Sequence, residues 1–400
     1  MKIVYVDETF HPAYGYQSTP LAKYQQKQGN EITIVTVSKD CIHPVYREFG
    51  DNGESIEQDD DIYQKSTGVR IIRVKTLGYF MHRARISCSL FKVVRDLHPD
   101  VVFVHCVETI TAMRFLLHKK EWPLMFDSHM LSMASKSRFV GLFEAGYRLV
   151  FKNIIEKNNY FVIRTQDDDY VNTHLGIKKE LTPFISFGTD TMLFCPSPEV
   201  RTSFREEYGI GQDEFVVVYT GKLTEAKGGL FLAETFRRKF DKQVTLVCVG
   251  TAPNSEYGKK VQQVLSESEN KVIMFPTQRY IDLPKFYQMA DLSIFPKQCS
   301  LSFYDAQACG LPVLSEINNV NCDRCNHNNG SNFVSGSIDD FRTNISKFAS
   351  MSKNEWLEYS RNARAFVVNG YDYNDIAKQY SFYLEKSIAQ YQLYYGESSK

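Results

Sequence analysis

The 400-residue sequence lacks the features that mark several protein classes. No apolar run approaches the roughly 18 residues of a membrane-spanning helix. The opening segment, residues 1–7, is too short and turns acidic too soon for a signal peptide. Lys plus Arg and Asp plus Glu number 47 each, so no overall basic charge points to nucleic acid. We therefore expect a cytoplasmic protein whose attraction for phosphate or membrane comes from local charge clusters.

Patterns for metals and disulfides are also scarce. The nine cysteines are scattered, and some, such as Cys248, stand in apolar runs where a reduced thiol acts as a small hydrophobe. This usage is typical of a reducing compartment. No His-Glu-x-x-His pattern occurs, and the single Cys-x-x-Cys at Cys322 and Cys325 lacks the second ligand pair of structural zinc, so a polar loop explains it better. We expect no bound metal and no cofactor.

Short apolar runs alternate with helical patterns along the chain, which is typical of parallel sheets covered by helices. Strands are predicted in two series, at 3–6, 32–37, 69–74, 101–104, 124–126, 160–163 and 181–185, and then at 215–219, 244–249, 271–275, 292–295, 312–314 and 332–334. Helices are expected between them, for example at 19–28 and 86–97, and the acidic stretch 51–61 is expected to be an exposed loop.

The two series predict an α/β protein of two doubly wound, Rossmann-like parallel-sheet domains with a cleft between them. Two prolines keep residues 194–198 out of regular structure and mark the junction. The expected domains are therefore 1–195 and 196–370. A final segment, 371–400, is expected to form a helix near 371–394 that packs back on the first domain.

One strand of the second series is followed by a glycine and two nearby lysines. Residues 216–220 are followed by Gly221 and Lys222, and Lys227 then opens a helix together with Gly228. Ligands of α/β folds bind at the carboxyl ends of strands, and lysines near helix amides suit a diphosphate. Two solvated surface lysines beside a glycine cap would give the same pattern.

A second motif reads as strand, polar loop, short helix, tight turn and strand, over residues 290–313. Asp305 is expected in the first turn of the short helix, where its carboxylate could accept hydrogen bonds from a ribose diol. An aspartate that only caps the helix or complements its dipole would look the same.

Taken in order, these motifs resemble the retaining glycosyltransferases of family four, especially those that build bacterial surface polysaccharides. The resemblance rests on Gly-Lys-x4-Lys-Gly at 221–228, on Ala-Asp at 290–291, and on Asp-Ala-x-Ala-Cys-Gly-Leu-Pro-Val at 305–313. Residues 15–17, 99–105, 127–129 and 188–194 fit the family in the right order, so the likeness covers nearly the whole chain. It implies the GT-B architecture and a nucleotide-diphosphate-sugar donor.

The resemblance also implies roles for individual residues. Lys222 and Lys227 would hold the diphosphate, Lys222 standing where an arginine is more usual, and His129 would face the donor from the first domain. These three are the implied catalytic residues. The implied donor-binding residues are Gly15, Gly221, Thr277, Gln278, Gln298, Ser300, Leu301, Ser302 and Asp305.

One position departs from the family. A glutamate usually stands eight residues before the ribose acid, and this chain has Lys297 there, in a shortened loop. The departure leaves the donor sugar open, with Gln298, Ser300 and Ser302 as replacement contacts. It also keeps a second interpretation open, a non-catalytic sugar- or partner-binding subunit of a glycosylation complex. A nucleotide-sugar epimerase on the same architecture is a third, and it would need acid and base carboxylates in the cleft.

Two stretches of the first half mix basic and apolar residues, 82–95 and 136–152. Basic amphipathic helices can lie on an anionic membrane, and an ordinary half-buried helix fits the same pattern. The resemblance implies a hexosyltransferase that moves a sugar to a glycan or lipid-linked acceptor. We further expect peripheral contact at the inner face of the membrane and no nucleic acid partner.

Overall fold

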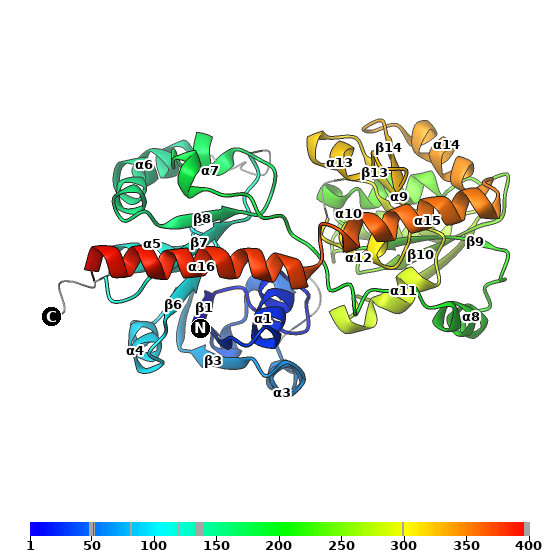
Figure 1. The fold of residues 1–400 in the computed structure, drawn as a ribbon. Helices are drawn as coiled ribbons and strands as arrows, with labels where there is room; N and C mark the ends of the chain where they lie inside the picture. The colour runs from blue at the N-terminus through cyan, green and yellow to red at the C-terminus, as the bar shows by residue number, and fades with distance from the viewer. Residues whose placement is uncertain are drawn as a thin grey trace. The chain divides into compact units, whose positions relative to one another are not determined.

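The computed structural model describes residues 1–47, 51, 53–80, 82–118, 120–132, 140–297 and 300–395. The chain forms two compact units, coloured mainly blue to green and green to orange in Figure 1. Unit 1 contains Met1–Arg47, Asp51–Phe187 and Tyr373–Lys400, and unit 2 contains Gly188–Asp372. The chain therefore changes unit after residues 187 and 372, whereas the sequence analysis placed these points after 195 and 370.

The difference at the first junction has a packing reason. The Thr189 hydroxyl donates a hydrogen bond of 2.5 Å to Asp305, deep in unit 2. Arg364 donates to the backbone oxygens of Thr191 and Phe194, and the Phe194 ring is fully buried. The segment before the prolines is thus part of the core of unit 2, and Pro198 begins its first helix.

Unit 1 is built on a six-stranded parallel sheet in the order β3-β2-β1-β6-β7-β8. The strands are β1 (Lys2–Asp7), β2 (Glu31–Val37), β3 (Arg70–Val74), β6 (Val101–Val104), β7 (Leu124–Ser128) and β8 (Phe161–Arg164). The central strands are buried along nearly their whole length, as expected of parallel strands covered on both faces. Because β1, β6 and β7 run parallel, their carboxyl ends meet at one edge.

Helices and one hairpin complete unit 1. The helices are α1 (Ser18–Lys27), α2 (Pro44–Arg47), α3 (Ile56–Thr67), α4 (Ser89–Asp96), α5 (Ile110–Leu117), α6 (Val140–Lys157), α7 (Tyr170–Thr173) and α16 (Tyr373–Tyr395). The hairpin pairs β4 (Thr76–Phe80) with β5 (Arg83–Ile86) in antiparallel fashion. Of the helices within the described ranges, none combines the length and apolar character that crossing a bilayer requires.

Unit 2 repeats the arrangement with a sheet in the order β11-β10-β9-β12-β13-β14. Its strands are β9 (Phe215–Thr220), β10 (Val244–Val249), β11 (Lys271–Phe275), β12 (Leu292–Phe295), β13 (Val313–Glu316) and β14 (Gly330–Phe333). Its helices are α8 (Pro198–Glu207), α9 (Gly229–Thr235), α10 (Glu256–Ser266), α11 (Pro284–Gln288), α12 (Ser302–Ala308), α13 (Asn319–Arg324), α14 (Ile338–Ala349) and α15 (Lys353–Val368). In both sheets the strand order reverses beside the first strand of the unit, which is where such folds bind ligands.

Three local predictions were wrong. Residues 181–185 form no strand, because Pro183 removes a donor and leaves a single bridge between Arg164 and Phe184. The second half of the acidic stretch 51–61 lies in α3, whose buried Ile56 and Tyr63 lie about two turns apart on one face of the helix. The helix expected at 86–97 is α4, and Ile86 ends the hairpin strand β5 instead.

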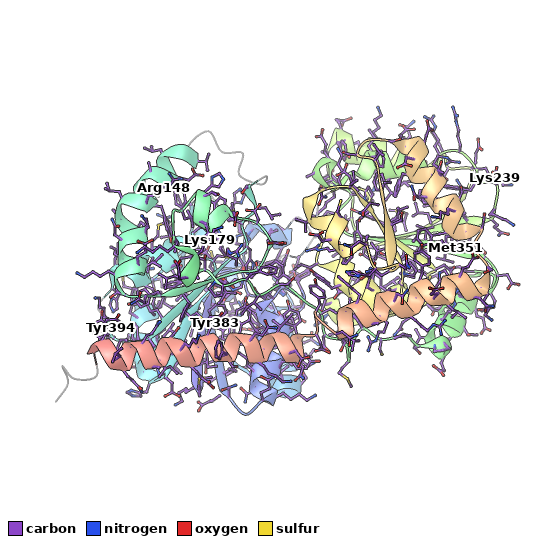
Figure 2. All side chains as sticks on the ribbon, turned by 45° about the horizontal axis from the view of Figure 1, so that its top comes forward. Arg148, Lys179, Lys239, Met351, Tyr383 and Tyr394 are labelled. Atoms are coloured by element: carbon purple, nitrogen blue, oxygen red, sulfur yellow. The ribbon has the colours of Figure 1, made fainter. Side chains whose placement is uncertain are left out.

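The terminal helix α16 returns to unit 1, as the sequence predicted. It packs along α1 and against β6 and β7, and Tyr383 and Tyr394 on it are labelled in Figure 2. Tyr380 is fully buried and receives a hydrogen bond of 2.5 Å from Gln17. Residues from both ends of the chain therefore share one core.

Candidate active site

The lysine-bearing turn of unit 2 begins where β9 meets β10. Gly221 follows β9 with a φ of +144°, and Gly250 follows β10 with a φ of +151°. A Cβ on Gly250 would lie 2.0 Å from the carbonyl oxygen of Gly221, so only glycine fits there. The two backbones meet at the carboxyl edge of the sheet.

Lys222 precedes the short 3-10 turn Glu225–Lys227, Lys227 is its last residue, and both lysines are half-buried. The Tyr219 hydroxyl donates to the carbonyl oxygen of Lys222 at 2.7 Å, which holds the start of the turn. Gly228 ends it with a left-handed φ of +76° and begins α9. The structure places both lysines at the expected edge of the sheet.

Lys297 reaches the same turn from the neighbouring strand β12. A Cβ on Gly228 would lie 3.1 Å from Cβ of Pro296 and 3.3 Å from Cγ of Lys297. The aliphatic stem of Lys297 therefore lies against the residue that follows Lys227. A third cation thus stands beside the predicted phosphate site, where the resemblance led us to expect an acid.

Asp305 lies in the first turn of α12, as predicted, but its carboxyl group is buried. The residue is 5% exposed, and the hydroxyls of Thr189 and Tyr280 donate to the carboxyl group. Burial, with a further contribution from Asp190, raises the pKa of Asp305 to about 7. The two hydrogen bonds lower the pKa, but by less. A ribose hydroxyl that donates to this carboxyl group must therefore share it with the Thr189 hydroxyl.

The other predicted donor contacts lie around the same edge. Thr277 follows β11, and its hydroxyl is 3.0 Å from that of Thr251 after β10. Gln278 donates to the carbonyl oxygen of Pro276. Ser300, Leu301 and Ser302 lead into α12 and are half-buried, and Gln298 lies outside the described residues.

In unit 1, His129 follows β7 and is bound to a buried carboxylate. Its Nε2 lies 3.1 Å from Oδ2 of Asp127, and Nδ1 of His105, which follows β6, lies 3.0 Å from the same oxygen. The other oxygen of Asp127 accepts the backbone N–H of Cys106 at 2.6 Å. Gly15, the remaining predicted residue, lies in the half-buried loop between β1 and α1.

Sequence reasoning had not assigned Asp127 and His105 to the site, although both were part of the family likeness. A signal was present, since both end neighbouring parallel strands and each lies beside a buried run. The missing information was that one carboxylate oxygen serves two imidazoles, and strand order alone does not give side-chain contacts.

Among the described residues, one group has side chains of the kind that bind metals. The ligating atoms of His105, Cys106, Asp127 and His129 lie within 4.8 Å of one another. Asp127 is already engaged by both imidazoles and a backbone amide. Burial, with the charges of Asp127 and a neighbouring glutamate, raises the pKa of the Cys106 thiol well above its usual value, which opposes the thiolate that a metal requires. We assign none of the four as a metal ligand.

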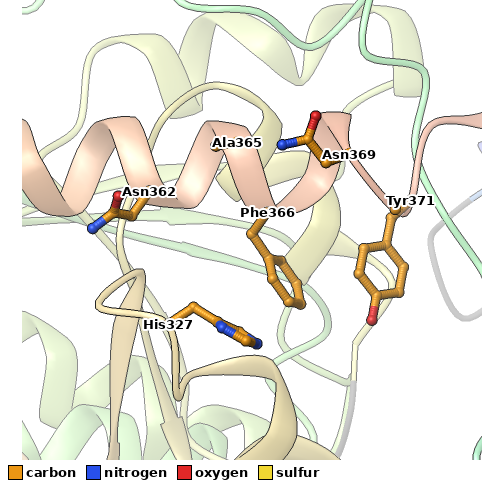
Figure 3. Close-up of a pocket in the computed structure, with 7 residues that line it drawn as sticks. His327, Asn362, Ala365, Phe366, Asn369 and Tyr371 are labelled. Atoms are coloured by element: carbon orange, nitrogen blue, oxygen red, sulfur yellow. The ribbon is translucent and has the colours of Figure 1, made fainter.

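A separate pocket of about 380 Å³ opens on unit 2 (Figure 3). The side chains of His327, Asn362, Phe366 and Tyr371 line it, and the Phe366 ring lies 4.9 Å from that of Tyr371. Since His327 precedes β14, this side of the pocket is at the amino end of the sheet, opposite the edge that carries the lysine turn.

Comparison with known proteins bears directly on unit 2. The family model described as "Glycosyl transferases group 1" matches residues 200–366, which contain the lysine turn, Lys297 and Asp305. Residues 200–366 are thus similar to this family.

Two curated relatives align with part of the chain. The lipopolysaccharide 1,2-N-acetylglucosaminetransferase of Salmonella typhimurium is 31% identical over 137 residues, 30% of this chain and 36% of the relative. The GDP-mannose-dependent alpha-(1-6)-phosphatidylinositol monomannoside mannosyltransferase of Mycolicibacterium smegmatis is 30% identical over 142 residues, 32% of this chain and 36% of the relative. The matching part thus spans about a third of each of these relatives.

The fold as a whole matches solved structures. Anabaena HepE, solved in complex with UDP and glucose, has a TM-score of 0.72 at 19% identity, covering 96% of this chain and all of that one. WaaG, described as a glycosyltransferase involved in lipopolysaccharide biosynthesis, has a TM-score of 0.65 at 14% identity and covers 96% and 99%. The segment that the family model matches is therefore the second half of a GT-B fold.

Proposed function

We propose that this chain is a retaining glycosyltransferase. It would move a hexose-type sugar from a nucleotide-diphosphate-sugar to a glycan or lipid-linked acceptor in cell-surface polysaccharide or glycoconjugate synthesis. The observation that carries the proposal is the lysine turn at the carboxyl edge of β9, because it lies inside the segment matched by the family model. The neighbour HepE, solved in complex with UDP, supports a nucleotide as the ligand of this fold.

The chemistry that the turn suits is departure of a nucleoside diphosphate. As the bond between the anomeric carbon and the phosphate oxygen breaks, negative charge grows on that oxygen. The backbone of both lysines is fixed, because Lys222 accepts from the Tyr219 hydroxyl and the Lys227 N–H donates to the Thr224 carbonyl oxygen, so little reorganisation of the turn is needed to stabilise the charge. In the front-face reaction implied by retention, the acceptor oxygen bonds to the same face, and its proton passes to the leaving phosphate.

Lys297 favours a site with strong attraction for anions. Three lysines around one turn offer more positive charge than a neutral sugar requires, and the diphosphate is the anion that the proposed donor supplies. We therefore predict that the reaction requires no metal ion to neutralise the diphosphate.

Isothermal titration calorimetry with UDP, GDP and ADP, followed by a nucleotide-release assay with glycan and lipid extracts, tests the proposal. We expect micromolar to millimolar binding of one nucleotide and its release from the matching nucleotide sugar when an acceptor is present. Failure to bind any of them at millimolar concentration would contradict the transferase and favour the non-catalytic subunit. Turnover of the nucleotide sugar without acceptor would favour an epimerase.

We also propose peripheral contact with the inner face of the membrane, through α6 of unit 1. Its Tyr147 and Ile155 are buried, while Leu142 and Leu149 on the opposite side are 76% and 75% exposed. Exposed apolar side chains on the outer side of a helix mark a surface that contacts a partner or a membrane. The other basic stretch is less suited, because Arg95 is paired with Glu121. Residues 136–139 of the second stretch lie outside the described residues.

A further inference from the structure

The pocket of about 380 Å³ on unit 2 is separate from the lysine turn and is lined by aromatic and amide side chains (Figure 3). Asn362, Phe366 and Asn369 follow one another by about one helical turn, so they share one face at the end of α15. His327 faces them from the segment before β14, and Tyr371 lies beyond the end of the helix. Pockets that hold small molecules have volumes of about 300–1,000 Å³. This pocket is therefore large enough for a ligand.

The rings of His327, Phe366 and Tyr371 form a row, called here the ring stack. The Phe366 ring lies 5.2 Å from that of His327, at an interplanar angle of 33°, and 4.9 Å from that of Tyr371, at 32°. Tyr371 in turn stacks at 4.7 Å on the buried ring of Tyr304, and the guanidinium of Arg324 lies 4.9 Å from the centre of the Tyr304 ring. The ring stack is thus anchored in the core of unit 2 at one end, while His327 at its other end is exposed.

Backbone hydrogen bonds also hold the walls of the pocket in place. The carbonyl oxygen of Tyr371 accepts the N–H of Thr189 at 2.9 Å. On the other side, Nδ2 of Asn362 donates to the carbonyl oxygen of Asn328, the residue after His327, at 3.3 Å. A site whose walls are ordered before binding loses less conformational entropy when a ligand enters. The pocket is therefore preformed.

The polar groups of the pocket select against charged ligands. Of the described residues that line it, none is a lysine, arginine, aspartate or glutamate. Within the same described residues, Oδ1 of Asn362 and the side-chain amide of Asn369 have no hydrogen-bond partner. An amide group offers both donors and an acceptor. A phosphate or carboxylate would find no fixed charge to offset its own, so the lining favours a neutral ligand with several hydroxyl groups.

A sugar ring combines the properties that this lining suits. The faces of a pyranose ring carry C–H groups, which pack against aromatic rings because the ring face is partly negative, and its edge carries hydroxyl groups, which pair with amides. We propose that the pocket is a second glycan-binding site, in which a neutral hexose unit packs against the ring stack and its hydroxyl groups bond to Asn362 and Asn369. The inference goes beyond the proposed transferase function, because the site holds a segment of glycan and its occupation needs neither a nucleotide nor turnover.

Saturation-transfer difference NMR on the full chain tests the site. The probes are the methyl glycosides of glucose, galactose, mannose and N-acetylglucosamine, together with maltotriose and cellotriose. We expect millimolar binding of at least one probe, with the strongest saturation on the C–H protons of one ring face, whether or not UDP is present. Methyl glucuronide, the charged analogue of methyl glucoside, should bind more weakly, and so should adenosine, which has an aromatic face but a different edge.

Three substitutions in α15 and its cap locate the binding. Asn369→Ala removes an exposed amide and should weaken binding about threefold to tenfold, the effect of one lost hydrogen bond. Phe366→Leu keeps an apolar side chain without the aromatic face, and should weaken binding by up to about tenfold. The matched control is Asn354→Ala, which should bind as wild type, since Asn354 is also exposed but lies at the other end of α15. Thermal unfolding checks that the variants fold, and Asn369→Ala decides if Phe366→Leu does not.

Four results would overturn the glycan site. They are no binding by wild type at tens of millimolar sugar, unchanged binding in Asn369→Ala, equal loss in Asn354→Ala, and tighter binding of adenosine or methyl glucuronide than of every neutral sugar. The outcome is independent of the transferase. A chain that binds these sugars in the pocket but binds no nucleotide would lose the transferase function and keep the glycan site. A chain that turns over a nucleotide sugar but binds no glycan here would show the reverse.

Discussion

At the scale of single residues, the buried carboxyl of Asp305 makes stability depend on pH. Its pKa of about 7 stands above the ordinary value of 3.8, so between these values the folded state keeps a proton that the unfolded chain has lost. Stability therefore falls as the pH rises from about 4 to about 7.

Asp305→Asn, which cannot ionise, should be more stable than wild type at pH 8, and the difference should disappear near pH 4. Thermal unfolding at the two pH values measures this, since 1 kcal/mol corresponds to about 2–4 °C in Tm for a unit of this size. A difference in Tm that is equal at both pH values would mean that the ionisation of Asp305 is not its cause.

The lysine turn gives a second prediction for single residues. Lys222→Ala and Lys227→Ala should each lower kcat by roughly 2–4 kcal/mol of transition-state stabilisation, about 30- to 1000-fold, if each acts as one preorganised donor to the leaving diphosphate. Folding should be retained, because both side chains are half-buried at the surface of unit 2. Lys260→Ala on α10 is the control, being an exposed lysine of the same unit. Turnover within twofold of wild type in both turn variants would remove the lysines from the mechanism.

At the scale of elements, the contact between the ends of β9 and β10 depends on Gly250. Alanine there would place a Cβ 2.0 Å from the Gly221 oxygen at a φ of +151°, so the lysine turn must move or the strands must separate. We expect Gly250→Ala to lower the free energy of unfolding by about 2 kcal/mol or more and to weaken nucleotide binding.

Gly146→Ala in α6 is the matched control for the Gly250 variant. A Cβ on Gly146 meets nothing within 4 Å, so alanine should stabilise the helix by up to about 1 kcal/mol. Urea unfolding of both variants provides the comparison. Equal stability of the two would show that the backbones at Gly221 and Gly250 can relax apart at little cost.

The outer side of α6 gives a prediction for membrane contact. Leu142→Asp and Leu149→Asp should each reduce sedimentation with anionic vesicles about tenfold or more, because burying a leucine contributes about 1.5–3 kcal/mol. Leu393→Asp on α16 is the control, since Leu393 is also 76% exposed. If all three variants lose binding alike, or none does, α6 is not the membrane-contacting element.

At the scale of the whole molecule, the return of the chain to unit 1 makes the two units unequal. Within the described residues, unit 2 is formed by the single segment Gly188–Asp372, while unit 1 includes segments from both ends of the chain. Tyr380 and Leu384 of α16 are fully buried in the core of unit 1, and Gln28, which caps the end of α1, donates to the backbone of Asn374.

We therefore predict that residues 188–372 fold alone and that residues 1–187 do not. Circular dichroism and thermal unfolding of the two fragments decide this, with cooperative unfolding expected only for the second. Adding a peptide of residues 373–395 to fragment 1–187 should restore part of its cooperativity. A stable fragment 1–187 would show that α16 covers a core that is already complete.

How far the sequence predicts this protein depends on how local each feature is. Most strands and α16 were predicted to within a few residues, because buried parallel strands leave short apolar runs in the sequence. The division into two units was also predicted, although the first junction was placed after residue 195 and lies after residue 187. The lysine turn was predicted because it directly follows such a run. The hairpin Thr76–Phe80 with Arg83–Ile86 was missed, since its first strand is half exposed without alternation and its second strand has only 4 residues.

What the sequence alone determined is the set of groups at the ends of the strands, such as Lys222, His129 and Asp305. Only the tertiary structure decided their chemical states. Burial raises the pKa of Asp305, whose carboxyl group accepts from Thr189, 116 residues away in the chain. Burial and His105 lower the pKa of His129, although both histidines contact the carboxylate of Asp127. A pKa depends on burial and on charges a few ångströms away, and these neighbours come from strands whose spacing in the sequence says nothing about their distance in space.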